Sequence, residues 1–214
     1  MTTRSWARWL SWGIVVPLLS LASLSCVEIK IVGASVVNGP VAGGGLTVRL
    51  DVAIAIEQQE QAEGEEAMDL PAEQTNQACY LAAVVPDGIG VTGGRIVGEE
   101  AMVGADGARA MGLSPQIAQV YAREFPLPAG QHWVALHAML DRVDTTRDHQ
   151  LALEMDMTGV PTGTSDLLVA LGYLDDIASE PDPARPTQLQ LVVGADKALV
   201  RVVPDEVPVA KEAA

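Results

Sequence analysis

The 214-residue chain is acidic and poor in aromatic residues: 28 acidic residues oppose 13 basic ones, for a net charge of −15, and aromatic residues make up 4%. A chain of this charge repels nucleic acid and anionic lipid head groups, so we expect no nucleic-acid partner. Few aromatic faces are available to stack on sugar rings, which disfavours a carbohydrate-binding module. Hydrophobic residues amount to 49%, which is enough for a sizeable aliphatic core.

Residues 1–25 have the layout of a bacterial export signal. Arg4 and Arg8 precede an uncharged run from Trp9 to Leu24 that ends in small residues. The run has 16 residues, whereas a membrane-spanning helix needs about 20 apolar ones. We therefore predict a signal peptide that is removed during export.

The residues around the expected cleavage point, Ser23-Leu24-Ser25-Cys26, resemble the lipobox of bacterial lipoproteins. That family usually has leucine where this chain has Ser23. The resemblance implies a lipid on Cys26 that anchors the mature chain, and Val27 after it implies transfer to the outer membrane. Ser23 and Ser25 also fit the small-x-small pattern of a general signal peptidase, and cleavage by that enzyme predicts a soluble periplasmic or secreted protein.

The second cysteine, Cys79, leaves three states open. With a lipid on Cys26, Cys79 is a small buried residue. In an oxidising compartment the two cysteines can instead form a disulfide, and two free thiols are the third state. Cys79 lies in an apolar stretch, where burial raises the pKa of a thiol and lowers its reactivity, so we expect no catalytic nucleophile there.

Alternation of apolar and polar residues with a period of two predicts that β-strands dominate. In the clearest case, Leu46–Ile56, the even-numbered residues form an apolar face while Thr47, Arg49 and Asp51 lie on the other face. Further strands are expected at residues 27–32, 78–85, 94–97, 131–140, 151–157, 166–174, 189–193 and 198–203.

Between these strands the sequence predicts one helix and two long loops. A short helix is expected at residues 115–123, because Ser114 can cap it and Pro115 suits its first turn. Residues 57–77 contain seven acidic and no basic residues, which predicts a solvated acidic loop. Residues 99–112 are rich in glycine, alanine and methionine and are expected to form a second loop.

Eight or nine strands with turn signals between them predict an all-β domain, an Ig-like antiparallel β-sandwich, over residues 26–178. Residues 179–214 should hold a proline-rich connector, a closing hairpin and a loose tail, either apart from the sandwich or within it. The stretches CYLAAVVPDGIGVTGGRIVG, FPLPAGQHWVALHAML and GVPTGTSDLLVALGYLDD, from residues 79 to 176, resemble Ig-like domains of secreted and surface bacterial proteins. The resemblance involves turn and core residues, and it implies fold and location without a specific activity.

Two motifs that suggest catalysis have simpler readings. Residues 88–93 spell GxGxxG, but a strand-like stretch follows where a dinucleotide site needs a helix, so we interpret the glycines as turn residues and expect no cofactor. Ser165 and Asp166 begin an expected strand, and no GxSxG motif is present, which disfavours a serine hydrolase.

Histidine and aspartate side chains are the candidate metal ligands. His132 and His137 differ by five positions and point to opposite faces of one strand, and a hairpin turn near Asp144 would not bring His149 to them, so no zinc site is predicted. Residues 141–148 are expected to form a polar turn, and three of its aspartates are candidate calcium ligands, with turn formation as the alternative role. They are Asp141, Asp144 and Asp148.

These observations predict an exported, lipid-anchored protein of the cell envelope with a binding or structural role and no enzymatic activity. Its expected partners are the membrane, through Cys26, and another envelope protein, and no small-molecule substrate is evident. A calcium-dependent adhesion or accessory module is the alternative function, and an envelope hydrolase is a third.

Overall fold

The computed structural model describes residues 27–41, 44–56, 74–98, 108–144, 147–174 and 186–203. The expected signal peptide 1–25, Cys26 and residues 57–73 of the expected acidic loop lie outside this part of the chain. Within the described ranges, no helix is both long and apolar enough to cross a membrane.

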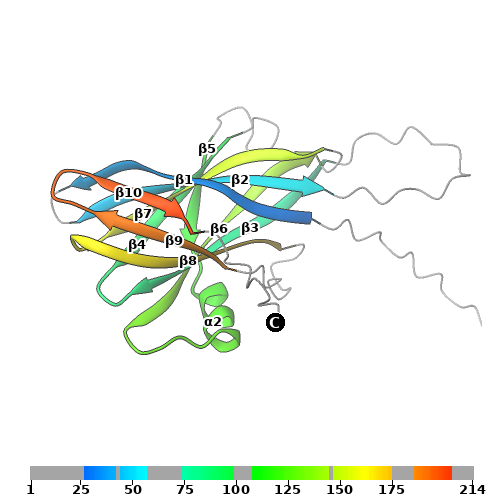
Figure 1. Ribbon diagram of the computed structural model, residues 1–214. Coiled ribbons are helices and arrows are strands. Elements are labelled where there is room, and N and C mark those ends of the chain that lie inside the picture. The colour runs from blue at the N-terminus through cyan, green and yellow to red at the C-terminus, as the bar shows by residue number, and fades with distance from the viewer. Residues whose placement is uncertain are drawn as a thin grey trace, which may run out of the picture.

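The described ranges contain ten strands and one short helix (Figure 1). The strands are β1 (Val27–Val41), β2 (Gly45–Ile56), β3 (Gln74–Pro86), β4 (Gly90–Gly98), β5 (Ala108–Leu113), β6 (Gln131–Asp144), β7 (His149–Thr158), β8 (Gly163–Leu174), β9 (Thr187–Val193) and β10 (Ala198–Val202), and the helix is α2 (Pro115–Glu124). The all-β class and the short helix are confirmed. The additional strand is β5, which forms within the stretch 99–112 that was expected to be a loop.

All ten strands belong to one antiparallel sheet, in the order β1-β2-β7-β4-β5-β6-β3-β8-β9-β10. β5 joins the two halves of this sheet, because residues 108–111 pair with β4 and residues 112–113 pair with β6. The edge strands β1 and β10 lie in contact, so the sheet curls into a nearly closed barrel (Figure 1). An immunoglobulin-type sandwich has two separate sheets, whereas pairing on both sides of β5 makes this sheet continuous.

The main core fills the inside of the barrel, and β2 shows how the sequence builds it. Leu46, Val48 and Leu50 are buried on the inner face, as the alternation predicts. On the outer face, Thr47 donates a hydrogen bond to the Asp156 carboxylate at 2.7 Å, and Arg49 pairs with Asp51 at 2.9 Å. β7 lies beside β2 and contributes its own inward methionines and leucines to the same cluster.

The strands β6 and β7 are consecutive in sequence but do not pair with each other as a hairpin. β6 pairs with β3 and β5, and β7 pairs with β2 and β4, so the chain crosses from one half of the sheet to the other after Asp144. The alternation pattern fixes which face of a strand is buried, but it does not specify the neighbouring strand. The hairpin β9–β10 does form, and β9 pairs with β8, which places it in the same sheet.

A second apolar cluster lies on the outer face of β3, β6 and β8, where α2 covers it. Ile117 and Tyr121 are the buried residues of α2, and Tyr121 packs against Tyr80 and Trp133 with ring centroids 5.9 and 4.9 Å apart. The expected side-chain cap does not form at Ser114, whose backbone carbonyl instead accepts the Ala118 N–H at 3.2 Å. β3 is therefore buried on both faces, which explains its continuous apolar sequence.

Gly172 of β8 should be essential to this second cluster, because it lies opposite Tyr80, and a Cβ atom at this position would overlap the Tyr80 ring. We expect Gly172→Ala to lower the free energy of unfolding by about 1–3 kcal/mol, as other overpacked cores do. Gly112→Ala is the matched control, since its Cβ meets nothing within 4 Å, and it should change stability by less than about 0.5 kcal/mol. Urea denaturation measures both, and equal costs for the two variants would contradict this packing.

Candidate binding groove

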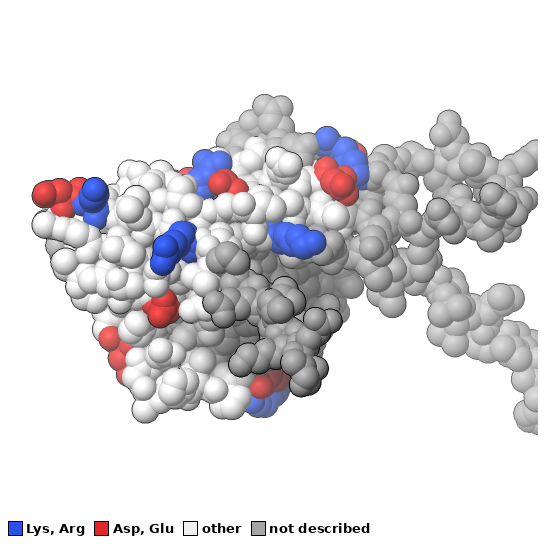
Figure 2. All heavy atoms as spheres, viewed as in Figure 1, with Lys and Arg blue, Asp and Glu red and all other residues white. Residues whose placement is uncertain are grey.

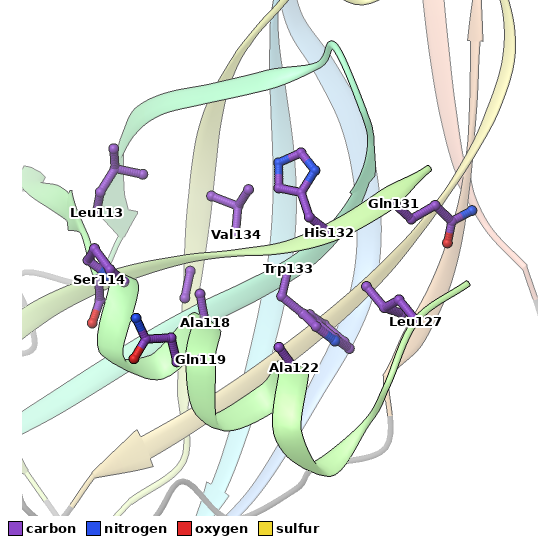
Figure 3. Close-up of a pocket in the computed structure, with 12 residues that line it drawn as sticks. Leu113, Ser114, Ala118, Gln119, Ala122, Leu127, Gln131, His132, Trp133 and Val134 are labelled. Carbon is purple, nitrogen blue, oxygen red and sulfur yellow. The ribbon is translucent and has the colours of Figure 1, made fainter. Parts of the chain in front are cut away.

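A groove of about 530 Å³ runs between α2 and the first half of β6 (Figure 3). Its walls come from the end of β5, from α2, from the loop after it and from β6. The lining residues are Leu113, Ser114, Pro115, Ala118, Gln119, Ala122, Leu127, Gln131, His132, Trp133, Val134 and Ala135. Leu113 stands at one end with 54% of its surface exposed.

None of the lining residues is aspartate, glutamate, lysine or arginine. Elsewhere on the visible surface, charged side chains of both signs are spread over the molecule (Figure 2). A larger hollow of about 670 Å³ lies over β2 and β7, and its lining includes Arg49 and Asp51. These two charged side chains already form an ion pair with each other. The groove beside α2 therefore differs from that hollow in having an uncharged wall.

The groove has a fixed floor, because its aromatic residue is held on several sides. The indole N–H of Trp133 donates a hydrogen bond to the backbone carbonyl of Phe125 at 3.0 Å. The ring also packs against Tyr121, whose hydroxyl lies 3.1 Å from the hydroxyl of Tyr80. Above this floor, Ala118 and Ala122 lie on the side of α2 that faces β6 (Figure 3). Small side chains on the helix keep the groove open.

The histidines lie at three separate places. The His132 ring nitrogen Nδ1 is 3.2 Å from the Asp87 carboxylate, which lies at the exposed turn after β3. His132 and Ser114 are well separated along the groove (Figure 3). His137 of β6 lies opposite Tyr80 of β3, and its buried Nε2 has no hydrogen-bond partner among the described residues. His149 is buried, with Nε2 2.6 Å from the backbone carbonyl of Asp144.

The other motifs are also placed by the structure. Gly88 has a φ of +94° in the turn after β3, whereas Gly90 and Gly93 lie in β4, which pairs with β7. Asp144 pairs with Arg147 at 3.3 Å, and the side chain of Asp141 lies outside the described part. Among described residues, no three histidine, cysteine, aspartate or glutamate side chains form a metal-binding group. The calcium candidates remain a prediction.

Cys79 lies inside the main core, and burial raises the pKa of its thiol to about 12. This agrees with the expectation of an unreactive thiol. The three states of the cysteine pair remain open, because Cys26 lies outside the described residues.

No family model matches the chain, and no curated protein matches it. Among solved structures, the collagen-binding domain of Erysipelothrix rhusiopathiae surface protein RspB is similar, with a TM-score of 0.31 and 11% identity over 75% of this chain and 44% of that one. The KRT10-binding region domain of the pneumococcal serine-rich repeat protein PsrP has a TM-score of 0.31 and 8% identity over 84% of this chain and 100% of that one. The match thus spans less than half of the RspB chain. Both are binding domains of bacterial proteins, and neither assigns a partner to this chain.

The sequence contains one signal for the groove that its motifs do not reveal. Residues 110–140 include only two charged residues, Arg123 and Glu124, although charged residues make up 19% of the chain. Those two lie at the end of α2 and pair with each other at 3.8 Å, outside the groove. A long uncharged stretch that contains a helix and a strand is therefore the feature that marks this surface.

The buried thiol of Cys79 should make the protein less stable in alkali. The native thiol keeps its proton up to a pKa of about 12, whereas the unfolded thiol loses it around 9.0. Between these values the unfolded state binds fewer protons, so the free energy of unfolding falls by about 1.4 kcal/mol per pH unit from this group. Denaturation of the wild type and of Cys79→Ala from pH 9 to 10.5 measures how steeply the free energy of unfolding falls with pH in each protein. Equal slopes for the two proteins would show that Cys79 is not a buried thiol.

Proposed function

We propose that the chain is an exported binding protein of a bacterial cell envelope, held to the membrane by a lipid on Cys26, with no enzymatic activity. The export layout of residues 1–25 and the resemblance around Cys26 support the anchor. β1 begins at Val27, so an anchor on Cys26 would sit directly beside the folded domain. Such a domain needs no spanning helix to stay at the membrane.

The observation behind the binding role is the groove between α2 and β6. It combines an uncharged lining with a floor fixed by the Trp133 indole hydrogen bond, and it ends at the exposed side chain of Leu113. Preformed apolar surfaces on rigid elements bind with little loss of conformational entropy. We propose that the groove binds an apolar segment of another envelope protein.

Although the continuous sheet differs from an immunoglobulin-type sandwich, the proposal includes kinship with Ig-like domains of bacterial surface proteins. It is supported by the antiparallel all-β architecture and by the turns in the stretches that carry the resemblance. Gly88, Gly159 and Gly163 have φ values of +94°, +69° and +131°, which fit the turn chemistry of those stretches.

One experiment tests the anchor and the groove together. The wild type, Cys26→Ser, Ala122→Lys and Gln116→Lys are expressed in bacteria fed radiolabelled palmitate, cross-linked, and purified from membranes. Ala122 is an exposed groove residue, and Gln116 is an exposed residue of the same helix outside the groove. We expect Cys26→Ser to lose the label, and Ala122→Lys to lose the cross-linked partner because a charged side chain then occupies the uncharged groove.

The control, Gln116→Lys, should keep both the label and the partner. Label that persists in Cys26→Ser would rule out lipidation at that residue. A partner retained equally by Ala122→Lys and Gln116→Lys would remove the groove from the proposal.

A further inference from the structure

The strand β6 is paired unequally along its two edges. On one side, β3 pairs with it continuously from Gln131 to Leu140. On the other side, β5 pairs only through Gly112 and Leu113, which lie opposite His137 and Leu136. One further hydrogen bond, from the Ser114 N–H to the Ala135 carbonyl at 2.8 Å, closes this contact before the chain turns into α2. In the described part of the chain, no strand pairs with residues 131–134 on that side.

The groove lies along this open edge rather than on one face of β6. Successive side chains of a strand point to opposite faces. His132 and Val134 project from one side of β6 and Trp133 from the other, and all three line the groove (Figure 3). A surface that contacts both faces of a strand must pass around its edge.

The orientation of the backbone groups follows from the hydrogen bond of Ala135. Its carbonyl points towards Ser114, on the β5 side of β6. In an antiparallel ladder the N–H and C=O groups of alternate residues point to the same side. The N–H and C=O groups of Trp133 and Gln131 therefore also point to the β5 side, into the groove, at the place where a longer β5 would run.

We propose, building on the binding role above, that this edge docks an extended, uncharged segment of a partner protein as an added β-strand beside β6. An extended polypeptide has hydrogen-bond donors and acceptors at the same spacing as the backbone N–H and C=O groups of Gln131 and Trp133. An apolar side chain or a lipid tail has no such donors and acceptors. The open edge of residues 131–134 is about 14 Å long, so it accommodates a strand of about four residues.

The wall of the groove determines which segment fits. Side chains of the added strand that point towards α2 meet Ala118, Ala122 and Leu127, so they are apolar. A charged side chain there would lose its hydration with no opposite charge among the lining residues to compensate. The preferred segment therefore alternates β-branched or other apolar residues with neutral polar ones, a pattern that also favours the extended conformation.

The test uses the full chain and capped heptapeptides of alternating valine and threonine, with a labelled lysine-containing tail outside the heptapeptide. Fluorescence anisotropy measures binding of three forms: the parent, one N-methylated at every valine amide, and one N-methylated at every threonine amide. Each methylation removes the donors of one edge of the peptide and leaves its side chains unchanged. Because only one edge can face β6, one methylated peptide should lose about tenfold or more in affinity and the other should bind nearly as the parent does.

Three further measurements fix the site and the selectivity. Ala122→Lys should weaken binding of the parent peptide by about tenfold or more, and Gln116→Lys should leave it within about twofold. A peptide with glutamate in place of its central valine should bind at least about tenfold more weakly than the parent.

Each contrary result has a distinct meaning. Equal affinities of the two methylated peptides, together with a loss in Ala122→Lys, would show that the groove binds apolar segments without strand addition, so the proposed function would stand and the added strand would not. No binding by the parent peptide would overturn the added strand as well. No effect of Ala122→Lys on either the peptide or the membrane partner would overturn both proposals. A dimer of the chain that the peptide dissociates would identify a second copy as the occupant and overturn the assignment to a different protein.

Discussion

The fold depends on enclosing one hydrophobic core within a single antiparallel sheet. Because side chains alternate across a strand, closing the sheet buries every second residue and leaves the others on the outside. Most of the outer face of β2 and β7 is polar and forms hydrogen bonds or ion pairs, such as Thr47 with Asp156. The outer face of β3, β6 and β8 is apolar instead and needs a cover, which α2 provides.

The groove is a consequence of that cover. To reach the outer face, the chain leaves β5 at Leu113 and begins α2 at Pro115, which has no N–H group to donate to a sheet and is suited to the first turn of a helix. β5 is therefore too short to pair with the first half of β6. An open strand edge, an uncharged helix face and a fixed indole ring then lie together. Open edges usually carry charges or bulges that prevent pairing with other chains, and the lining here has no charged residue of that kind.

The sequence predicted the individual elements better than their arrangement. Alternation in Leu46–Ile56, the apolar run at 78–85 and the helix start at Pro115 all depend on local chemistry. The structure confirms these elements, although Ser114 forms no side-chain cap. β5 was missed because its glycine and alanine content favours a loop, and pairing with β4 and β6 overrides that preference. The separation of β6 and β7 depends on long-range pairing, which no local pattern encodes. The groove was missed for the same reason, since it needs a helix and a distant strand edge to meet.

Hydrogen exchange of individual backbone amides in β6 tests the open edge most directly. The N–H of Trp133 points into the groove, whereas the N–H of Val134 points to β3, with which β6 pairs along this stretch. We expect the Trp133 amide to exchange faster than the Val134 amide by on the order of 100-fold or more, because only the latter is protected by the ladder. Equal protection of the two amides in the isolated protein would show that the edge is already occupied and would contradict the account.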